Sequence, residues 1–279
     1  MTSGANWSAA FGEAAVSAMQ VYDEVMVPRL FAPWAELLVD RLEIQPGEAV
    51  LDVACGPGSV TRIAAARSGA GGRVVGCDLS AAMLAVAGSK PAPEGAAPIE
   101  YREAPAERLP VREAEFDVAT CQQGLQFFPD RPAALAEMHR ALRPGGRLGV
   151  AVWAEIPLCP PFAAIGDALE EVAGAELADR YRGGPWGFPD GARLEALVRE
   201  AGFEDVRVSR EVLPLSFEGG GTQLFATLAA TPLAAEIGRF PEDQKRGLSD
   251  AIARRLGGGA IESHAESNVA LARQPTDHV

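Results

Sequence analysis

Between residues 49 and 153 the chain alternates short apolar runs with segments whose apolar residues recur every three or four positions. The first pattern has the length of buried strands, and the second is typical of amphipathic helices. The runs that predict strands are 49–54, 73–77, 99–102, 116–121 and 147–153, of which 99–102 is the weakest. Strands and helices that alternate at these lengths predict a parallel, doubly wound α/β sheet.

The helices between these strands carry recognisable end signals. Ser80 has the residue type of an N-cap and is placed directly before an apolar helical segment. Asp130 and Pro132 open a later helix, since an acidic cap and a first-turn proline both favour helix starts. That helix is predicted to end at Leu142, just before a Pro-Gly-Gly turn.

The segment before the first strand, 1–44, is predicted to be a helical cover. Its apolar stripe consists of Leu30, Phe31, Trp34, Leu37, Leu38 and Leu42. The stripe stops at Gln45-Pro46-Gly47, a turn signal. We therefore separate this cover from a core domain at 45–153.

After Trp153 the regular alternation is interrupted twice. The interruptions, 154–190 and 217–260, are irregular and contain helical segments, one of them around 162–172. Between and after them we predict a helix at 191–201 and strands near 206–213 and 266–273. The remainder, 154–279, is thus predicted to complete the sheet and to add two lid insertions.

The first strand runs directly into a glycine turn, Leu51-Asp52-Val53-Ala54-Cys55-Gly56-Pro57-Gly58, and then into a helix. Glycines at such a turn let the backbone approach a ligand closely, because no Cβ intervenes. Asp78 ends the next strand about 20 residues after Gly58, the spacing of an acidic residue that binds ribose hydroxyls. An ordinary helix-capping role for Asp78 remains the alternative.

Two residues favour S-adenosylmethionine over a dinucleotide. Thr61 occupies the position where a dinucleotide fingerprint has its third glycine. Asp52 lies near the end of the first strand, where a carboxylate would repel a pyrophosphate but suit a ligand with an ammonium and a sulfonium. A structural role for Asp52, capping the glycine loop, remains the alternative.

Four segments in order resemble the class I methyltransferases, above all the ubiquinone/menaquinone-biosynthesis branch (methyltransferase type 11). They are VLDVACGPG, VVGCDLS with Met83, FDVATCQQGLQFFPD and LRPGGRL, and AERLP at 106–110 matches the loop that this family uses to hold adenine. The resemblance is good over about 45–153, loose over the N-terminal helices and poor elsewhere. It implies a Rossmann-like methyltransferase fold that binds S-adenosylmethionine.

The resemblance also implies roles for individual residues. The implied cofactor-binding residues are Asp52, Ala54, Cys55, Gly56 and Gly58 at the methionine part, Asp78 at ribose, Leu79, Met83, Ala106 and Glu107 at adenine, and Cys121 and Gln122 beside the sulfonium and amine. Pro105 departs from the family, which often has an aspartate there for the adenine amino group. Met83 has a helix-core role as its alternative.

The acceptor side is less well marked. Candidate residues there are Tyr22, as a lid residue over the cofactor, Gln123, Gln126, Phe127, Phe128 and Trp153, each with a packing role as an equal alternative. Phe162, Trp186, Phe188 and Phe225 in the lid insertions are interpreted as walls of an apolar pocket, with simple packing as the alternative.

No catalytic base stands out. His139 is predicted to lie on the solvent face of its helix, His264 and His278 lie near the C-terminus, and Asp23 and Glu24 have nothing that singles them out. Because a sulfonium is already a good leaving group, in-line placement of the nucleophile can contribute roughly 7–11 kcal/mol by itself.

Charge and composition narrow the function classes. The net charge is −13 and no run of Lys or Arg is present, which disfavours nucleic acid and anionic membranes as partners. The four cysteines form no CxxC pair, so we expect no metal site and a reducing compartment. Without a signal-peptide pattern or a long apolar run, a cytoplasmic protein is expected.

The sequence therefore predicts an S-adenosylmethionine-dependent methyltransferase (EC 2.1.1.-) that methylates a small molecule, an aromatic or secondary metabolite, by in-line displacement. Two alternatives stay open. One is an enzyme of the same fold that catalyses a cyclisation or rearrangement without methyl transfer, and the other is a non-catalytic module that binds the cofactor. The methylated atom (O, N or C) and the oligomeric state, monomer or homodimer, are not fixed by the sequence.

Overall fold

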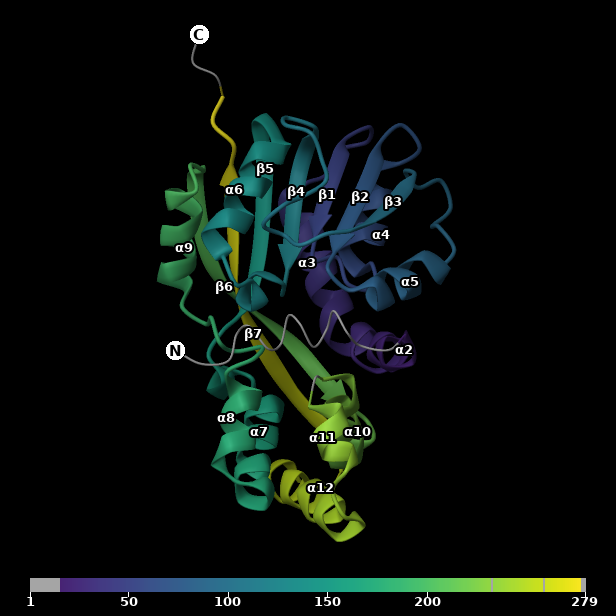
Figure 1. Ribbon diagram of the computed structural model, residues 1–279, viewed down its shortest axis with the longest axis vertical. Coiled ribbons are helices and arrows are strands. Elements are labelled where there is room, and N and C mark those ends of the chain that lie inside the picture. The colour runs from purple at the N-terminus through teal and green to yellow at the C-terminus, as the bar shows by residue number, and fades with distance from the viewer. Residues whose placement is uncertain (1–15, 232, 258, 277–279) are drawn as a thin grey trace.

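The computed structural model describes residues 16–231, 233–257 and 259–276. Within these residues a seven-stranded sheet has the order β3-β2-β1-β4-β5-β7-β6 (Figure 1). The strands are β1 Ala49–Val53, β2 Arg73–Asp78, β3 Ile99–Glu103, β4 Phe116–Gln122, β5 Leu142–Trp153, β6 Glu204–Phe217 and β7 Ile261–Arg273. Strands β1 to β5 pair in parallel, and β7 runs antiparallel to both of its neighbours. The predicted doubly wound sheet is confirmed.

Helices cover both faces of this sheet (Figure 1). The α-helices of the described residues, some of which lie beyond the sheet, are α2 Val16–Val25, α3 Ala32–Leu42, α4 Ser59–Ser68, α5 Ala81–Ser89, α6 Arg131–Ala141, α7 Pro160–Ala173, α8 Ala175–Arg182, α9 Gly191–Glu200, α10 Gly220–Ala226, α11 Ala234–Gly238 and α12 Glu242–Leu256. Successive residues of a strand point to opposite faces. Val50 accordingly packs in the cluster that contains α3 and α4, and Leu51 packs in the cluster that contains α6 and α9.

Local signals set the helix starts as predicted. Ser80 Oγ accepts a hydrogen bond from Met83 N at 3.3 Å, and Asp130 Oδ1 accepts one from Ala133 N at 3.0 Å. The N-terminal stripe is less regular than predicted, because a π-helical turn, Val27–Phe31, separates α2 from α3. The part of the predicted cover at 1–15 lies outside the described residues.

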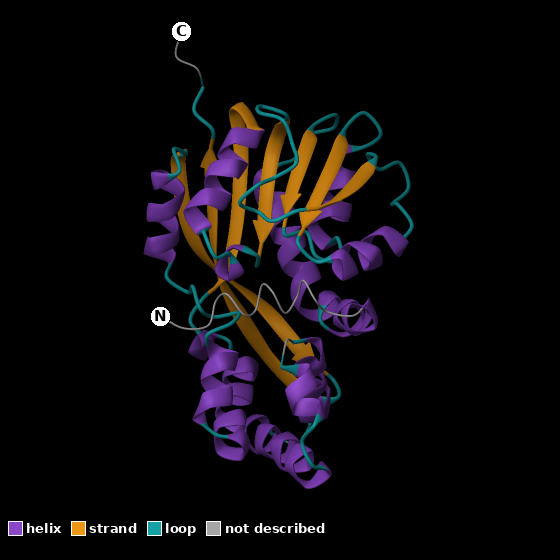
Figure 2. Ribbon diagram, in the orientation of Figure 1, coloured by secondary structure: helices purple, strands orange, loops and turns teal. Residues whose placement is uncertain are grey.

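Strands β6 and β7 are longer than predicted. Strand β5 follows β7 as far as the pair Trp153–Ser267, but β6 and β7 stay paired to Phe217–Ile261. Beyond the sheet they form a two-stranded ribbon that carries α7, α8 and α10 to α12 (Figure 2). We call these five helices the lobe. The two predicted lid insertions are therefore helical and share one support, the ribbon.

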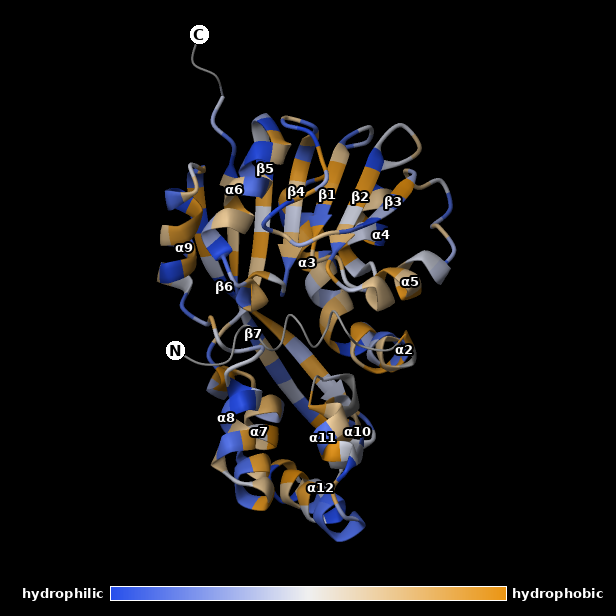
Figure 3. Cartoon of the chain, in the orientation of Figure 1, coloured by the Kyte–Doolittle hydropathy of each residue, from blue (hydrophilic) through white to orange (hydrophobic). Residues whose placement is uncertain are grey.

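Hydropathy differs between the central strands and the outer end of the lobe. The central strands are apolar along much of their length, whereas α12 at the outer end of the lobe carries many hydrophilic residues (Figure 3). Within the described ranges, no helix has both the length and the apolar character needed to cross a membrane.

Candidate active site

A cavity of about 290 Å³ opens where the carboxyl ends of β1, β2 and β4 face α2, the π-helical turn and the lobe. The carboxyl edge of the strands is where open α/β sheets bind ligands. The predicted site residues that line the cavity are Tyr22, Asp52, Ala54, Cys55, Gly56, Asp78, Leu79, Met83, Ala106, Glu107, Gln122, Gln123, Phe127, Phe128, Trp153, Phe162 and Trp186.

In the glycine loop after β1, every second residue has its backbone in the left-handed region. These residues are Ala54 (φ 56°), Gly56 (φ 54°) and Gly58 (φ 85°). A Cβ on Gly56 would meet no atom within 4 Å, so its backbone is open to a ligand. A Cβ on Gly58 would lie 2.6 Å from Tyr101 Oη. Gly58 is therefore required for packing beneath the loop, and it does not line the cavity.

Asp78 connects β2 to this loop. Its Oδ2 accepts a hydrogen bond from Gly56 N, and its Oδ1 accepts one from Ser80 N, both at 2.8 Å. Burial raises the pKa of this carboxyl, and the backbone N–H groups oppose that effect by favouring the charged form. Each oxygen retains a second lone pair, so the carboxylate can accept further bonds from ligand hydroxyls.

Asp52 is held from inside the protein. It is 1% exposed and accepts hydrogen bonds from Thr61 Oγ1 at 2.6 Å and Thr120 Oγ1 at 2.8 Å. Burial raises its pKa to about 6, and the two threonine bonds act in the opposite direction. Thr61, which replaces the third glycine of a dinucleotide fingerprint, thus fixes the Asp52 carboxylate under the glycine loop.

Apolar side chains line the side of the cavity that follows β2 and β3. Leu79 is 42% exposed, whereas Met83 and Ala106 are buried. An exposed leucine at a cavity edge offers apolar surface that a flat ring can cover. Pro105 also lines the cavity, without an acidic group at that position, and Glu107 accepts a long bond (3.4 Å) from Asp130 N.

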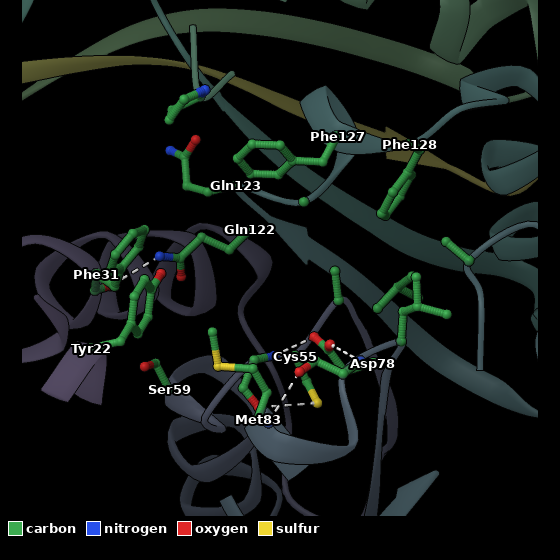
Figure 4. Close-up of a pocket in the computed structure, with 18 of the residues that line it drawn as sticks. Tyr22, Phe31, Cys55, Ser59, Asp78, Met83, Gln122, Gln123, Phe127 and Phe128 are labelled. Carbon is green, nitrogen blue, oxygen red and sulfur yellow. Dashed lines mark hydrogen bonds between the residues drawn. The ribbon is translucent and has the colours of Figure 1, made fainter. Parts of the chain in front are cut away.

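The N-terminal cover is fastened to the end of β4 by Gln122. Its Nε2 donates to Phe31 O at 2.9 Å, and its Oε1 is buried without a partner among the described residues. Tyr22 stacks on Phe31 with 5.1 Å between ring centroids, and both rings lie beside the Gln122 amide (Figure 4). Burial, followed by the nearby charges of Asp78 and Asp23, raises the pKa of Tyr22 well above its usual value.

Aromatic rings form the wall on the lobe side. Trp153 at the end of β5 contacts Phe31 at 6.1 Å between centroids. Trp186 packs between Phe162 at 5.4 Å and Tyr181 at 5.3 Å. Burial raises the pKa of the Tyr181 hydroxyl well above its usual value, so this group stays protonated. Trp186 and Phe162 were predicted from the sequence, but Tyr181 was not, because nothing in the segment around it distinguishes a cavity residue from one that packs within helices.

Some predicted residues do not reach the cavity. Besides Gly58, these are Cys121, Gln126, Phe188 and Phe225. Cys121 is fully buried in the sheet, and Gln126 donates from Nε2 to Gln123 Oε1 at 3.3 Å behind the cavity wall. Phe188 packs under the Arg131 guanidinium at 4.6 Å. The contacts of these residues in the structure are packing contacts, and their predicted roles at a ligand stay predictions.

His139 is also placed differently from the prediction. It is half-buried and not fully on a solvent face, since it packs edge-on against Phe203 with 5.0 Å between ring centroids. Burial lowers its pKa, and it does not line the cavity. Helical periodicity missed this contact because the partner follows α9, far along the chain.

Lys90 was not singled out by the sequence. Its Nζ donates to Asp23 Oδ1 at 2.5 Å and to Pro57 O at 2.8 Å. One ammonium group therefore ties α2, which carries Tyr22, to the glycine loop. Both side chains of the ion pair are about four-fifths buried, with 22% and 19% exposure.

The residues present fit S-adenosylmethionine. Asp78 has spare lone pairs for ribose hydroxyls, Gly56 leaves its backbone uncovered, and Gln122 Oε1 is an unpaired buried acceptor suited to an ammonium group. A buried acceptor without a partner is costly, so a ligand donor at this position would be stabilising. The fit rests on these three observations.

Comparison with known proteins gives a consistent result. The profile of the ubiE/COQ5 methyltransferase family matches residues 11–213. Nocamycin O-methyltransferase of Saccharothrix syringae is 36% identical over 208 residues, which cover 70% of this chain and 72% of the relative. Demethylmenaquinone methyltransferase of Lactococcus lactis is 31% identical over 211 residues, which cover 71% of this chain and 81% of the relative.

A solved structure shares the fold. Phosphoethanolamine N-methyltransferase 2 of Haemonchus contortus, in complex with phosphomonomethylethanolamine and S-adenosylhomocysteine, superposes with a TM-score of 0.62 at 18% identity. The match covers 99% of this chain and 61% of that chain. From the family match and the two relatives, this chain belongs to the ubiE/COQ5 methyltransferase family and is an S-adenosylmethionine-dependent methyltransferase.

Proposed function

We propose that this enzyme methylates a small-molecule acceptor, an aromatic or secondary metabolite, that binds in the lobe half of the cavity. By lobe half we mean the part lined by Trp153, Phe162, Tyr181 and Trp186. The observation that carries the proposal is continuity: the same cavity extends from Gly56 and Asp78 to these aromatic rings. The names of both relatives, which refer to nocamycin and demethylmenaquinone, support a small-molecule acceptor.

In this proposal the chain mainly binds and orients. Asp78 accepts hydrogen bonds from ribose, Leu79 and Met83 cover adenine, and Gln122 Oε1 accepts from the ammonium group. When bound, S-adenosylmethionine supplies a methyl group on a sulfonium, which is a good leaving group. The aromatic wall holds the acceptor in line with that methyl group and excludes water, and such placement can contribute roughly 7–11 kcal/mol.

We also propose that the enzyme is cytoplasmic and that it acts on a small molecule and not on nucleic acid or a membrane. The four cysteines are buried and unpaired, as a reducing compartment maintains them. The net charge of −13 disfavours phosphate-rich surfaces.

The test is a balance of products. Purified enzyme is incubated with S-adenosylmethionine and a panel of naphthols and naphthoquinols, and S-adenosylhomocysteine and acceptor mass are followed by mass spectrometry. We expect equal amounts of S-adenosylhomocysteine and of an acceptor heavier by one methylene unit. An altered acceptor without S-adenosylhomocysteine would instead indicate a cyclisation or rearrangement. Cofactor binding without any acceptor binding would indicate a non-catalytic module.

A further inference from the structure

We propose that a second cavity, at the end of the sheet remote from the active site, binds a small anion that carries a phosphate group. The cavity measures about 210 Å³ and shares none of its described lining residues with the candidate active site. It lies where β7 ends, on the side of the sheet opposite the lobe (Figure 1). Its charged lining residues are Arg41, Arg147, Asp205, Arg207 and Arg273. The inference is therefore independent of the proposed function.

The fold gathers the four arginines of this cavity from four separate elements. Arg41 belongs to α3, Arg147 to β5, Arg207 to β6 and Arg273 to β7. The sequence contains no run of Lys or Arg and has a net charge of −13, so the cluster is a local exception to the charge of the chain. A cluster of positive charge around a cavity raises the local concentration of small anions.

Strand pairing places two of the arginines directly opposite each other. Arg147 of β5 is in register with Arg273 of β7, and Arg207 of β6 is in register with Leu271. Leu271 packs against the core cluster that contains α3. Since alternate residues of a strand point to the same face, all three arginines lie on the face that α3 covers. Like charges directly opposite each other destabilise a sheet, and an anion between them would offset this repulsion.

Two of the arginines already have a carboxylate partner. Arg41 Nη2 pairs with Glu211 Oε1 at 2.8 Å, and Arg147 Nη2 pairs with Glu48 Oε2 at 2.6 Å. A guanidinium group has five N–H donors, and Arg41 uses one of them in a hydrogen bond to the described residues. Arg41 therefore retains donors for a ligand after its ion pair has formed.

The other two arginines have no carboxylate partner within the described ranges. Arg273 Nη1 reaches a backbone oxygen, Gly145 O, at 3.5 Å, and it forms no ion pair with Glu204, which is opposite it in register. The Arg207 side chain makes no hydrogen bond or ion pair with any residue that the structure describes. Asp205 adds one opposing charge to the lining, from a β-bulge where its φ is 52°.

A phosphate group suits this lining better than a carboxylate. Guanidinium groups bind the oxygens of both anions through charge-assisted hydrogen bonds. A carboxylate offers two oxygens in one plane, whereas a terminal phosphate offers three oxygens in a tetrahedral arrangement. That arrangement matches donors that come from four different elements. Because the chain as a whole is acidic and would repel a long phosphate backbone, we infer a small phosphate compound and not a nucleic acid.

The first experiment measures binding of defined probes by calorimetry at constant ionic strength. The probes are inorganic phosphate, glycerol phosphate, succinate and a short single-stranded oligonucleotide. We expect both phosphates to bind at least about fivefold more tightly than succinate. Tighter binding of inorganic phosphate would identify free phosphate as the ligand, and tighter binding of glycerol phosphate would identify a phosphate monoester. Equal or tighter binding of succinate or of the oligonucleotide would overturn the inference, as would a lack of saturation by about 10 mM phosphate.

The same titrations are repeated with enzyme saturated with S-adenosylhomocysteine. We expect phosphate affinity to be unchanged, because the two cavities are separate. Loss of phosphate binding would place the anion in the active site and refute the inference. A failure of S-adenosylhomocysteine to bind would count against the proposed function alone.

Variants that remove a guanidinium group locate the anion. Arg207→Gln and Arg273→Gln should each weaken binding of the phosphates by about tenfold, because each removes charge-assisted bonds from an exposed side chain. Arg210→Gln is the matched control, since Arg210 also belongs to β6 but pairs with Glu155 at 2.9 Å outside the cavity. The same loss in all three variants would show a general charge effect and not a site.

A variant that should gain affinity completes the test. Asp205→Asn removes the opposing charge from the lining and keeps a residue type that tolerates left-handed backbone, so the fold should be unaffected. We expect it to bind the phosphates about three- to tenfold more tightly than the parent enzyme. Glu218→Gln removes the same charge at the far end of β6 and should leave the affinity unchanged. Unchanged or weaker binding by Asp205→Asn would contradict an anion in this cavity.

Discussion

The two halves of the cavity are built by different means. The sheet half is made of backbone in left-handed conformation, as at Gly56, and of carboxylates held by hydrogen bonds. Asp78 accepts one at 2.8 Å and Asp52 accepts one at 2.6 Å. The lobe half is made of neutral aromatic side chains, such as Trp186 and Tyr181, packed ring against ring. The difference separates two tasks: the sheet half recognises polar groups at fixed positions, and the lobe half selects by shape and apolar surface. Variants that affect one half and spare the other test this separation.

We expect the largest effect from Asp78→Ala. The change removes a charged acceptor whose hydrogen bonds are worth about 1.5–3 kcal/mol each, so loss of two ribose bonds should weaken S-adenosylhomocysteine binding by at least about 100-fold. The dissociation constant of S-adenosylhomocysteine is measured by calorimetry. The control is Glu103→Ala, because Glu103 is the β3 neighbour of Asp78 in register yet does not line the cavity. If Asp78→Ala binds as well as the parent enzyme, the ribose role is wrong.

The corresponding change in the lobe half is Trp186→Ala. We expect acceptor binding, probed with 2-naphthol, to weaken by about 10- to 50-fold, because each aromatic contact contributes about 0.5–1.5 kcal/mol beyond the buried area. Cofactor affinity should change little.

Phe188→Ala is the matched control for Trp186→Ala. Phe188 is also 8% exposed and lies two residues away, but it packs on Arg131 outside the cavity. Its loss should lower stability without selective loss of acceptor affinity. A conservative Trp186→Phe variant should recover most of the binding. Parallel losses for cofactor and acceptor in Trp186→Ala would mean that Trp186 supports the fold as a whole.

A third prediction separates the two glycines of the loop. Both have positive φ, so alanine costs about 1–2 kcal/mol of backbone strain at either position. Gly58→Ala must in addition displace Tyr101, and we expect it to lower the free energy of unfolding more than Gly56→Ala. Gly56→Ala should instead weaken cofactor binding by about tenfold in a folded protein. Denaturant titration measures the free energy of unfolding, and calorimetry measures cofactor affinity. If Gly58 were the ligand contact, Gly58→Ala would weaken cofactor binding more than Gly56→Ala.

The smallest effect is expected for Lys90→Met, which removes the tie between α2 and the glycine loop. We expect cofactor affinity to fall by about three- to tenfold and amide exchange in α2 to accelerate, because a partly buried charged bond contributes about 1–2 kcal/mol. Arg67→Met is the control, since Arg67 pairs with Asp40 at the surface with both side chains more than half exposed. Unchanged exchange in α2 would rule out a fastening role for Lys90.

The same division explains what the sequence could predict. The sheet half depends on local patterns, so the glycine turn, Asp78 and the cap at Ser80 were found from neighbouring residues. The lobe half depends on contacts between separate segments, and Tyr181 has no local signature. The Lys90–Asp23 pair, which joins α2 to the glycine loop, has none either. Likewise Gly58 and Cys121 match family positions yet lie behind the cavity wall, because a motif gives the residue type and not the direction of its side chain.

The strand order also sets the sequence of events during folding. Strand β7 follows β6 in the chain but lies between β5 and β6, so β6 cannot join the sheet until β7 has been synthesised and inserted. Until then the edge of β5 is unpaired, and an unpaired edge invites contact with other chains. Contacts between residues so far apart in sequence also form slowly. A nascent chain that stops before Ile261 should therefore depend on chaperones and aggregate without them, even though the segments that form the sheet half of the cavity are already complete.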